Sequence, residues 1–176
     1  MADHFAILGI PRGFRLDETA LEQRYRELSR LLHPDRHAAR SPAERRLALE
    51  KMIEVNDAYR VLRDPVRRAA YLLSQRGWDL GESGNASHLP PGFLMEVMET
   101  REAFEEARAQ KDRERVAKLA EAARVQREGA LEALGAAFDR DDDREAAAQV
   151  AIIRYLDSFL SDVRAWEDEL FEEEHG

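Results

Sequence analysis

The sequence contains no cysteine, few aromatic residues and no long uninterrupted apolar run. Without cysteine the chain cannot form disulfides, use a cysteine nucleophile, or bind zinc or an iron–sulfur cluster through thiolates. No segment approaches the roughly 18 consecutive apolar residues of a membrane helix. The N-terminal residues also lack the basic and apolar regions of a secretory signal. We therefore expect a cytoplasmic protein that contacts no membrane.

The charge of the chain is divided unevenly along its 176 residues. Residues 1–76 carry 15 Lys and Arg against 11 Asp and Glu, a surplus of +4. The remaining residues carry 12 Lys and Arg against 25 Asp and Glu, a net charge of −13. Opposite signs predict two domains with different partners, and the strongly acidic one disfavours nucleic acid as a ligand.

Helical periodicity and capping residues dominate the N-terminal segment, where only the run Phe5–Ile10 is compatible with either a strand or a helix end. Asp17 is a suitable N-cap for a helix that must end near His33, because Pro34 follows. The apolar stripe of that helix is formed by Leu21, Tyr25, Leu28 and Leu32. Ser41 and Asp64, each followed by proline, predict two further helices that extend to Leu62 and over residues 66–75.

Ser, Gly, Asn and Pro residues between Trp78 and Pro91 indicate a domain boundary. Beyond it we expect helices at about 93–109, 112–138 and 145–171, with the acidic tract 139–143 capping the last. Long helices with short connections favour an antiparallel three-helix bundle. The predicted fold class is all-α, with domains at 1–77 and 92–176 and a linker at 78–91.

The tripeptide His33-Pro34-Asp35 lies between two amphipathic helices. Pro34 ends the first helix and presents an imidazole and a carboxylate to solvent, where Asp35 can pair with an arginine of a partner. The surrounding pattern resembles the J-domain of DnaJ-type co-chaperones over about the first 75 residues. Its further elements are Tyr25, Leu28, Leu32, Ile53, Asn56-Asp57-Ala58-Tyr59, Leu62, Asp64-Pro65, Arg68 and Tyr71.

This resemblance implies a helical hairpin that docks on a heat-shock ATPase chaperone of the DnaK or HscA class and accelerates its ATP hydrolysis. His33, Pro34 and Asp35 would form the essential loop. Arg24, Arg26 and Arg30 on the preceding helix would make electrostatic contacts with the chaperone. The alternative interpretation of the arginines is solvated surface, the usual state of long basic side chains.

The rest of the chain lacks the Gly/Phe-rich linker and the cysteine-rich zinc region of DnaJ. It resembles instead the HscB family of iron–sulfur co-chaperones, in the segments 5–11, 14–17, 68–73 and 93–102. This resemblance implies that the C-terminal bundle binds an IscU-type iron–sulfur scaffold protein. The cluster would belong to the scaffold, and we expect no cofactor or metal bound by this chain.

A helical wheel of residues 93–107 separates two faces. One face is apolar and suits a core, and it holds Phe93, Val97, Phe104 and Ala107. The other combines three apolar residues with carboxylates, as a partner-binding surface does: Leu94, Met95, Met98, Glu99, Glu102 and Glu106. The resemblance assigns these six residues, with Tyr155, to the scaffold. Coverage by another helix or by the J-domain is the alternative for this face, and Tyr155 fits a core position nearly as well.

Three other interpretations remain open. The first is a J-domain adaptor with a different client, and the second is a protein that binds nucleic acid through its basic helix. The third is a small hydrolase or metal enzyme centred on His33, Asp35 and His37, although no nucleophile motif accompanies them. The preferred interpretation is a non-enzymatic co-chaperone of the bacterial cytoplasm that delivers the scaffold to the ATPase and assists cluster transfer.

Overall fold

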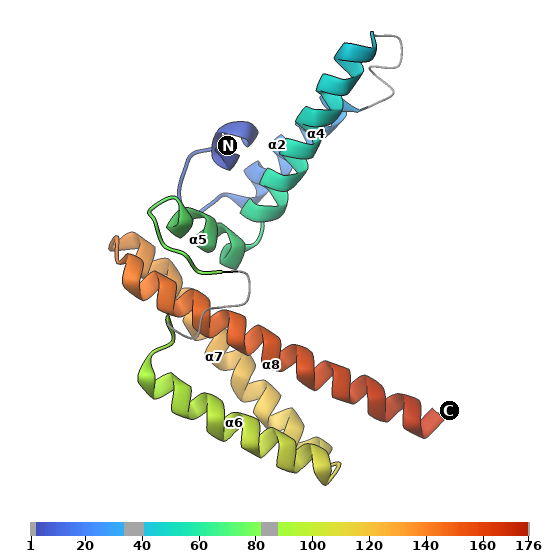
Figure 1. Cartoon of the computed structure of the whole chain (residues 1–176), viewed down its shortest axis with the longest axis vertical. Coiled ribbons are helices and arrows are strands. Elements are labelled where there is room, and N and C mark those ends of the chain that lie inside the picture. Colours follow the sequence, from blue (N-terminus) through green and yellow to red (C-terminus); the bar gives the residue numbers. More distant parts are fainter. Residues whose placement is uncertain (1–2, 34–40, 82–87, 176) are drawn as a thin grey trace. The chain divides into compact units, whose positions relative to one another are not determined.

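The computed structural model describes residues 3–33, 41–81 and 88–175, and within these ranges it contains seven α-helices and no strand (Figure 1). The chain divides into two compact units, unit 1 (Met1–Gln75) and unit 2 (Arg76–Gly176). None of the helices in the described ranges is sufficiently long and apolar to cross a membrane. The predicted all-α fold is confirmed.

Unit 1 is built on a hairpin of two helices, α2 (Glu18–Leu32) and α4 (Pro42–Leu62) (Figure 1). The short helix α1 (His4–Leu8) packs against both, and α5 (Pro65–Ser74) packs against α4. The apolar run near the N-terminus is therefore helical. The core between these helices includes Phe5, Leu8, Leu21, Val55, Ala58, Leu62 and Leu73.

Each helix start that the sequence predicted in unit 1 is capped by the expected side chain. Asp17 accepts a hydrogen bond from the backbone N–H of Ala20 across 3.0 Å. Ser41 and Glu44 form a reciprocal capping box. Asp64 accepts from the backbone N–H groups of Val66 and Arg67, each at 2.9 Å. These bonds satisfy N–H groups that have no partner inside the helix.

The apolar stripe predicted for α2 is only partly enclosed. Leu21 is buried, whereas Tyr25, Leu28 and Leu32 are half-buried. The stripe faces the core, but only Leu21 is completely enclosed. Two paired helices bury one line of contact, and a third layer is needed to enclose the side chains on its flanks.

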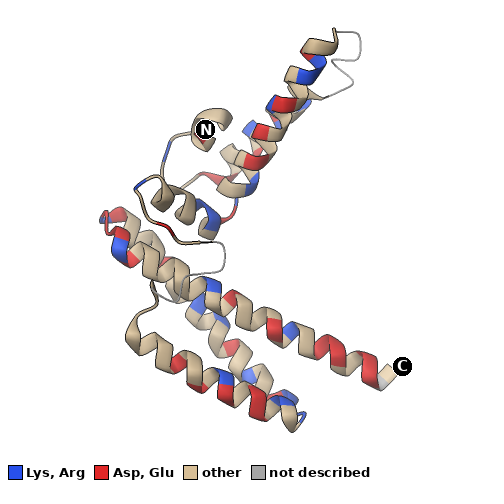
Figure 2. Cartoon of the chain, in the orientation of Figure 1, with Lys and Arg blue, Asp and Glu red and all other residues tan. Residues whose placement is uncertain are grey.

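Unit 2 is an up-down-up bundle of α6 (Pro91–Ala109), α7 (Arg113–Asp139) and α8 (Asp143–His175), as the sequence predicted (Figure 1). The last helix begins two residues earlier and ends four residues later than expected. Asp and Glu are frequent on α6 and along the C-terminal part of α8 (Figure 2). The acidic surplus of the sequence therefore lies on the bundle surface.

Both turns of the bundle have the same backbone conformation and the same pattern of hydrogen bonds. Lys111 and Asp141 adopt positive φ angles of 52° and 53°. The following residues, Asp112 and Asp142, donate backbone hydrogen bonds to the carbonyls of Ala107 and Ala137, each across 2.9 Å. Their side chains then cap the next helix. This reversal needs only three residues, which explains why α7 extends to Asp139 and α8 begins so early.

An aromatic cluster joins α6 to α8. Phe104 meets the ring of Phe159 edge-on at 5.5 Å and that of Trp166 at 6.4 Å. The apolar stripe of α8 is buried along its whole length, at Ile152, Leu156, Phe159, Val163 and Trp166. Part of the segment predicted as a linker also belongs to unit 2, because Leu80 is buried and its carbonyl accepts from Arg154 across 2.8 Å.

Candidate partner-binding surfaces

The apolar residues predicted to bind the scaffold lie on the surface of α6. The exposed fraction is 38% for Leu94, 66% for Met95 and 73% for Met98. The other helices of the bundle therefore leave this face open to solvent. Hydrophobic side chains are normally scattered singly over a protein surface, so three within five residues mark a candidate contact surface. We call Leu94, Met95 and Met98 the α6 patch.

The opposite face of α6 holds the patch in place. Phe93, Phe104 and Ala107 are buried in the bundle, and Val97 is half-buried. The wheel therefore assigned the two faces correctly. Because the buried residues anchor both ends of this stretch of helix, the patch is presented outward from a fixed backbone.

Tyr155 on α8 lies directly beneath this region, half-buried. Its hydroxyl donates a hydrogen bond to the carbonyl of Val97 across 3.4 Å, and its ring meets Phe93 edge-on at 5.7 Å. Burial raises the pKa of Tyr155 above its ordinary value, so it remains a neutral donor. Through these contacts Tyr155 supports α6. The sequence alone did not distinguish this role from that of a core residue.

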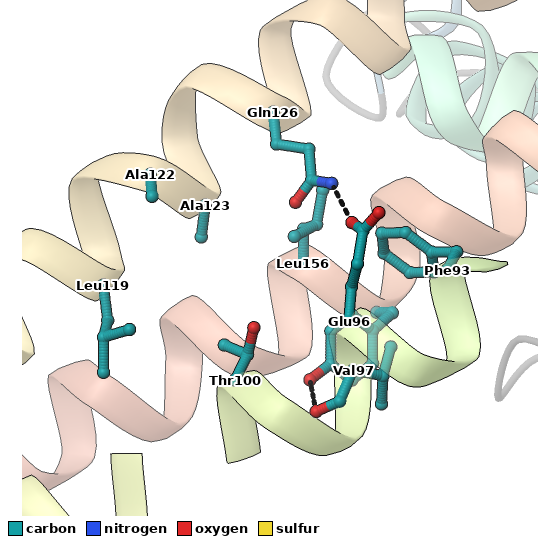
Figure 3. Close-up of a pocket in the computed structure, with 10 residues that line it drawn as sticks. Phe93, Glu96, Val97, Thr100, Leu119, Ala122, Ala123, Gln126 and Leu156 are labelled. Atoms are coloured by element: carbon teal, nitrogen blue, oxygen red, sulfur yellow. Dashed lines mark hydrogen bonds between the residues drawn. The ribbon is translucent and has the colours of Figure 1, made fainter. Parts of the chain in front are cut away.

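The carboxylates predicted around the patch are all exposed. Glu106 forms an ion pair with Arg115 of α7 at 2.7 Å. Glu96, which the wheel excluded from the patch, instead accepts a hydrogen bond from Gln126 of α7 across 2.9 Å. Figure 3 shows this bond at the edge of a cavity of about 60 Å³ between the three helices. Of the three predicted carboxylates, Glu99 and Glu102 lie nearer to the patch in sequence than Glu106.

The second candidate surface is the end of α2 in unit 1. His33 is exposed and leaves the helical conformation, with φ −57° and ψ 133°, as expected before a proline. Pro34 and Asp35 lie outside the described residues, as does His37 of the metal-site alternative. Among the residues that the structure describes, no group of three His, Asp or Glu side chains is arranged to hold a metal.

The three arginines predicted to contact the chaperone differ in their surroundings. Arg24 donates to the carbonyl of Leu8 across 3.2 Å and to Glu27 across 2.6 Å. Arg26 pairs with Glu22 at 2.5 Å, and Arg30 is exposed. Arg24 therefore has a structural role at the end of α1, where Gly9 closes the helix with a φ of 63°.

The sequence analysis missed the role of Arg68. Its side chain is only 5% exposed, and it donates to the carbonyl of Leu62 at the end of α4 across 2.6 Å. Its guanidinium also lies over the ring of Phe14, 5.2 Å from the centroid. The J-domain pattern includes Arg68, but the sequence alone does not show that its side chain is buried, because the partner carbonyl belongs to another helix.

Comparison with known proteins identifies both units. Residues 3–71 match the DnaJ domain family, and residues 89–164 match the HSCB C-terminal oligomerisation domain. A co-chaperone protein HscB homolog from Burkholderia multivorans is 40% identical over 162 residues, which is 92% of each chain. The chain belongs to the HscB co-chaperone family. The family's fold is also seen in solved structures of HscB proteins.

Chaperone HscB from Vibrio cholerae superposes with a TM-score of 0.81 and 31% identity, covering 96% of this chain and 99% of that one. Human co-chaperone protein HscB gives a TM-score of 0.84 and 28% identity, over 94% and 82% of the two chains. The resemblances to the J-domain and to HscB are thus confirmed. Membership in this family also confirms the expected class, a co-chaperone rather than an enzyme.

Proposed function

We propose that this HscB-family protein carries an IscU-type iron–sulfur scaffold to an HscA-type heat-shock ATPase and stimulates ATP hydrolysis there. The J-domain, over residues 1–77, engages the ATPase, and the bundle, over residues 92–176, binds the scaffold. The segment 78–91 connects them. Relatives that match nearly the whole chain are named co-chaperones, which supports action beside a chaperone. The relatives compared from Burkholderia favour the bacterial cytoplasm as the place of action.

The observation that carries the proposal is the α6 patch. Exposure of an apolar surface to water costs free energy, and a partner that covers the surface removes this cost. Methionine is unbranched and adapts to an irregular partner surface. Exposed carboxylates at Glu99 and Glu102 add a polar rim that excludes proteins of the same charge and favours a basic contact.

The ATPase is engaged through the loop His33-Pro34-Asp35, with Arg26 and Arg30 as accessory contacts. Binding both partners at once places the scaffold beside the ATPase at high local concentration. Because coupling between two binding sites is reciprocal, whatever the scaffold adds to the affinity for the chaperone, the chaperone adds equally to the affinity for the scaffold. The iron–sulfur cluster is the cargo of the scaffold, since this chain has no thiol to bind it.

The scaffold half of the proposal is tested by replacing Leu94, Met95 and Met98 with alanine. We expect the triple variant to lose most of its affinity for the purified scaffold, because buried apolar anchors cost on the order of 1–2 kcal/mol or more each. A matched control replaces Leu47, Leu49 and Ile53 on α4, which are exposed to 57%, 57% and 53%. Equal scaffold affinity of the two variants would reject the α6 patch, and a different client would then be sought.

The chaperone half is tested by the rate of ATP hydrolysis of the purified HscA-type ATPase. Wild type should accelerate it, and His33→Gln should abolish the acceleration while scaffold affinity and helical circular dichroism stay unchanged. Normal stimulation by His33→Gln would show that the loop does not carry the activity.

A further inference from the structure

Unit 1 contains a groove that the proposed function does not use. It lies where α2, the end of α4 and the start of α5 meet, and its volume is about 470 Å³. Tyrosine and arginine side chains dominate its walls. The groove is lined by Tyr25, Asn56, Tyr59, Arg60, Arg63, Asp64 and Arg67. We call it the arginine groove.

Two stacked tyrosines form one wall of the groove. The rings of Tyr25 and Tyr59 lie 4.0 Å apart and are tilted by only 9°. The hydroxyl of Tyr25 donates to the Oδ1 atom of Asn56 across 3.1 Å, which ties α2 to α4. The guanidinium of Arg63 lies over the ring of Tyr59 at 5.6 Å. Tyr59 already has two ring neighbours, so it is poorly placed to stack on a nucleic-acid base.

The charge of the groove is positive. Arg60, Arg63 and Arg67 line it, and all three side chains are exposed. Asp64 is the acidic residue of the lining, and its carboxylate is engaged by the two N–H groups at the start of α5. That helix terminus carries partial positive charge and offsets the carboxylate. Arg60 pairs with Asp57 at 3.1 Å, which leaves Arg63 and Arg67 as the main source of positive potential.

The α2 helix, by contrast, has no surplus of charge. Its arginines, at positions 24, 26 and 30, equal in number its glutamates, at positions 18, 22 and 27. Arg24 and Arg26 form ion pairs within the helix. The α4–α5 junction therefore provides positive charge that α2 lacks (Figure 2).

We propose that the arginine groove receives an acidic peptide segment of the HscA-type ATPase, and this inference rests on the function proposed above. A guanidinium binds a carboxylate through two parallel hydrogen bonds, and Arg63 at the end of α4 and Arg67 in the first turn of α5 present two such groups. The groove belongs to the same unit as the His33 loop, so one partner can reach both. A long polyanion such as nucleic acid is disfavoured by the net charge of −9.

The two contacts have different kinetic signatures. The groove contributes affinity, whereas the loop triggers hydrolysis. Loss of groove charge should therefore raise the concentration of this protein that gives half-maximal stimulation and leave the maximal rate unchanged. Because the contact is electrostatic, its loss should also make that concentration less sensitive to salt.

The experiment titrates the full chain into the purified ATPase and compares wild type with the double variant Arg63→Gln and Arg67→Gln. We expect the half-saturating concentration to rise about five- to tenfold. The matched control is Arg45→Gln with Arg46→Gln, two exposed arginines of α4 that lie roughly 20 Å along the helix from the groove. The control should behave as wild type. If wild type stimulates the ATPase and the two double variants have equal half-saturating concentrations, the groove inference is overturned. The proposed function is not affected by that result.

A direct measurement of binding to the ATPase distinguishes failure of the groove inference from failure of the proposed function. If wild type binds the ATPase without stimulating it, the proposed function fails, and weaker binding of the groove variant still supports the groove. If wild type does not bind, both fail.

Competition provides a measurement that needs no variant. An octaglutamate peptide should inhibit stimulation by wild type, and an octalysine peptide should not inhibit it. Inhibition by a dT oligonucleotide at equal charge would assign the groove to nucleic acid and overturn the inference. Self-association in sedimentation, lost in the groove variant, would assign it to a second copy and overturn it also.

Discussion

Arg101 on α6 donates a hydrogen bond to the Oδ2 atom of Asp162 on α8 across 2.6 Å. The same guanidinium lies over the ring of Tyr155, 5.7 Å from its centroid. Together with the bond from Tyr155 to Val97, these contacts hold α6 against α8 beneath the α6 patch. The surface proposed for the scaffold is therefore supported by polar contacts as well as by buried apolar residues.

The first prediction concerns this ion pair. A double-mutant cycle of Arg101→Gln and Asp162→Asn should give a coupling of about 0.5–1 kcal/mol in the free energy of unfolding, because both side chains are partly exposed. Trp78 and Trp166 both lie in unit 2, so tryptophan fluorescence in urea reports on this unit. Additive effects of the two substitutions would show that the pair adds nothing.

The second prediction tests whether Arg24 stabilises the end of α1 or serves only as a contact for the chaperone. Arg24→Gln should weaken the protection of α1 amides from hydrogen exchange by about 1 kcal/mol, because the carbonyl of Leu8 loses a donor. Arg26→Gln, whose side chain pairs only at the surface, should change stability by less than about 0.5 kcal/mol. Equal protection in the two variants would contradict a structural role for Arg24.

The third prediction concerns the buried arginine of α5. Arg68→Met leaves the carbonyl of Leu62 without its side-chain donor and should destabilise unit 1 by about 1–3 kcal/mol. Arg67→Met removes the same functional group from an exposed neighbour and should be almost neutral for stability. Hydrogen exchange of α4 and α5 measures both. A neutral effect of Arg68→Met would mean that water replaces the guanidinium at no cost.

The fourth prediction is a pH dependence of unit 1. Burial lowers the pKa of His4 in the folded chain below its ordinary value of 6.5, although Asp3 and Asp57 oppose the shift. The unfolded chain then binds the proton more tightly. This contribution to stability is therefore complete above about pH 6.5 and is lost as pH falls through the folded pKa.

The variant His4→Gln should lack this pH-dependent contribution to stability. Thermal unfolding followed by circular dichroism at about pH 7.5 and about pH 5 measures it as the difference between wild type and variant, since the carboxylates titrate in both. A drop in Tm of the same size in both proteins would disprove the assignment to His4.

Local signals in the sequence predicted most of the fold. Asp17, Ser41 and Asp64 act on N–H groups two or three residues away, so their capping is readable without any tertiary contact. The exposed α6 patch was also predictable, because the apolar residues that anchor the helix determine which side remains outside. The roles of the patch and of the His33 loop stay predictions.

Other features of the candidate surfaces were hidden in the sequence. Arg24 and Arg68 look like exposed basic residues until the carbonyls of Leu8 and Leu62 are found beside them. Tyr25 and Tyr59 are 34 residues apart in the chain, and only the packing of α2 on α4 stacks their rings.

The sequence by itself determined where the capped helices of unit 1 begin, which face of a helix is apolar, and which family the motifs resemble. All of these depend on bonds and periodicities that span a few residues. Tertiary structure decided which arginines cap a neighbouring helix, what Tyr155 supports and where positive charge gathers. Those outcomes depend on which elements meet in space, and distant parts of a chain are brought together only by the burial of their shared core.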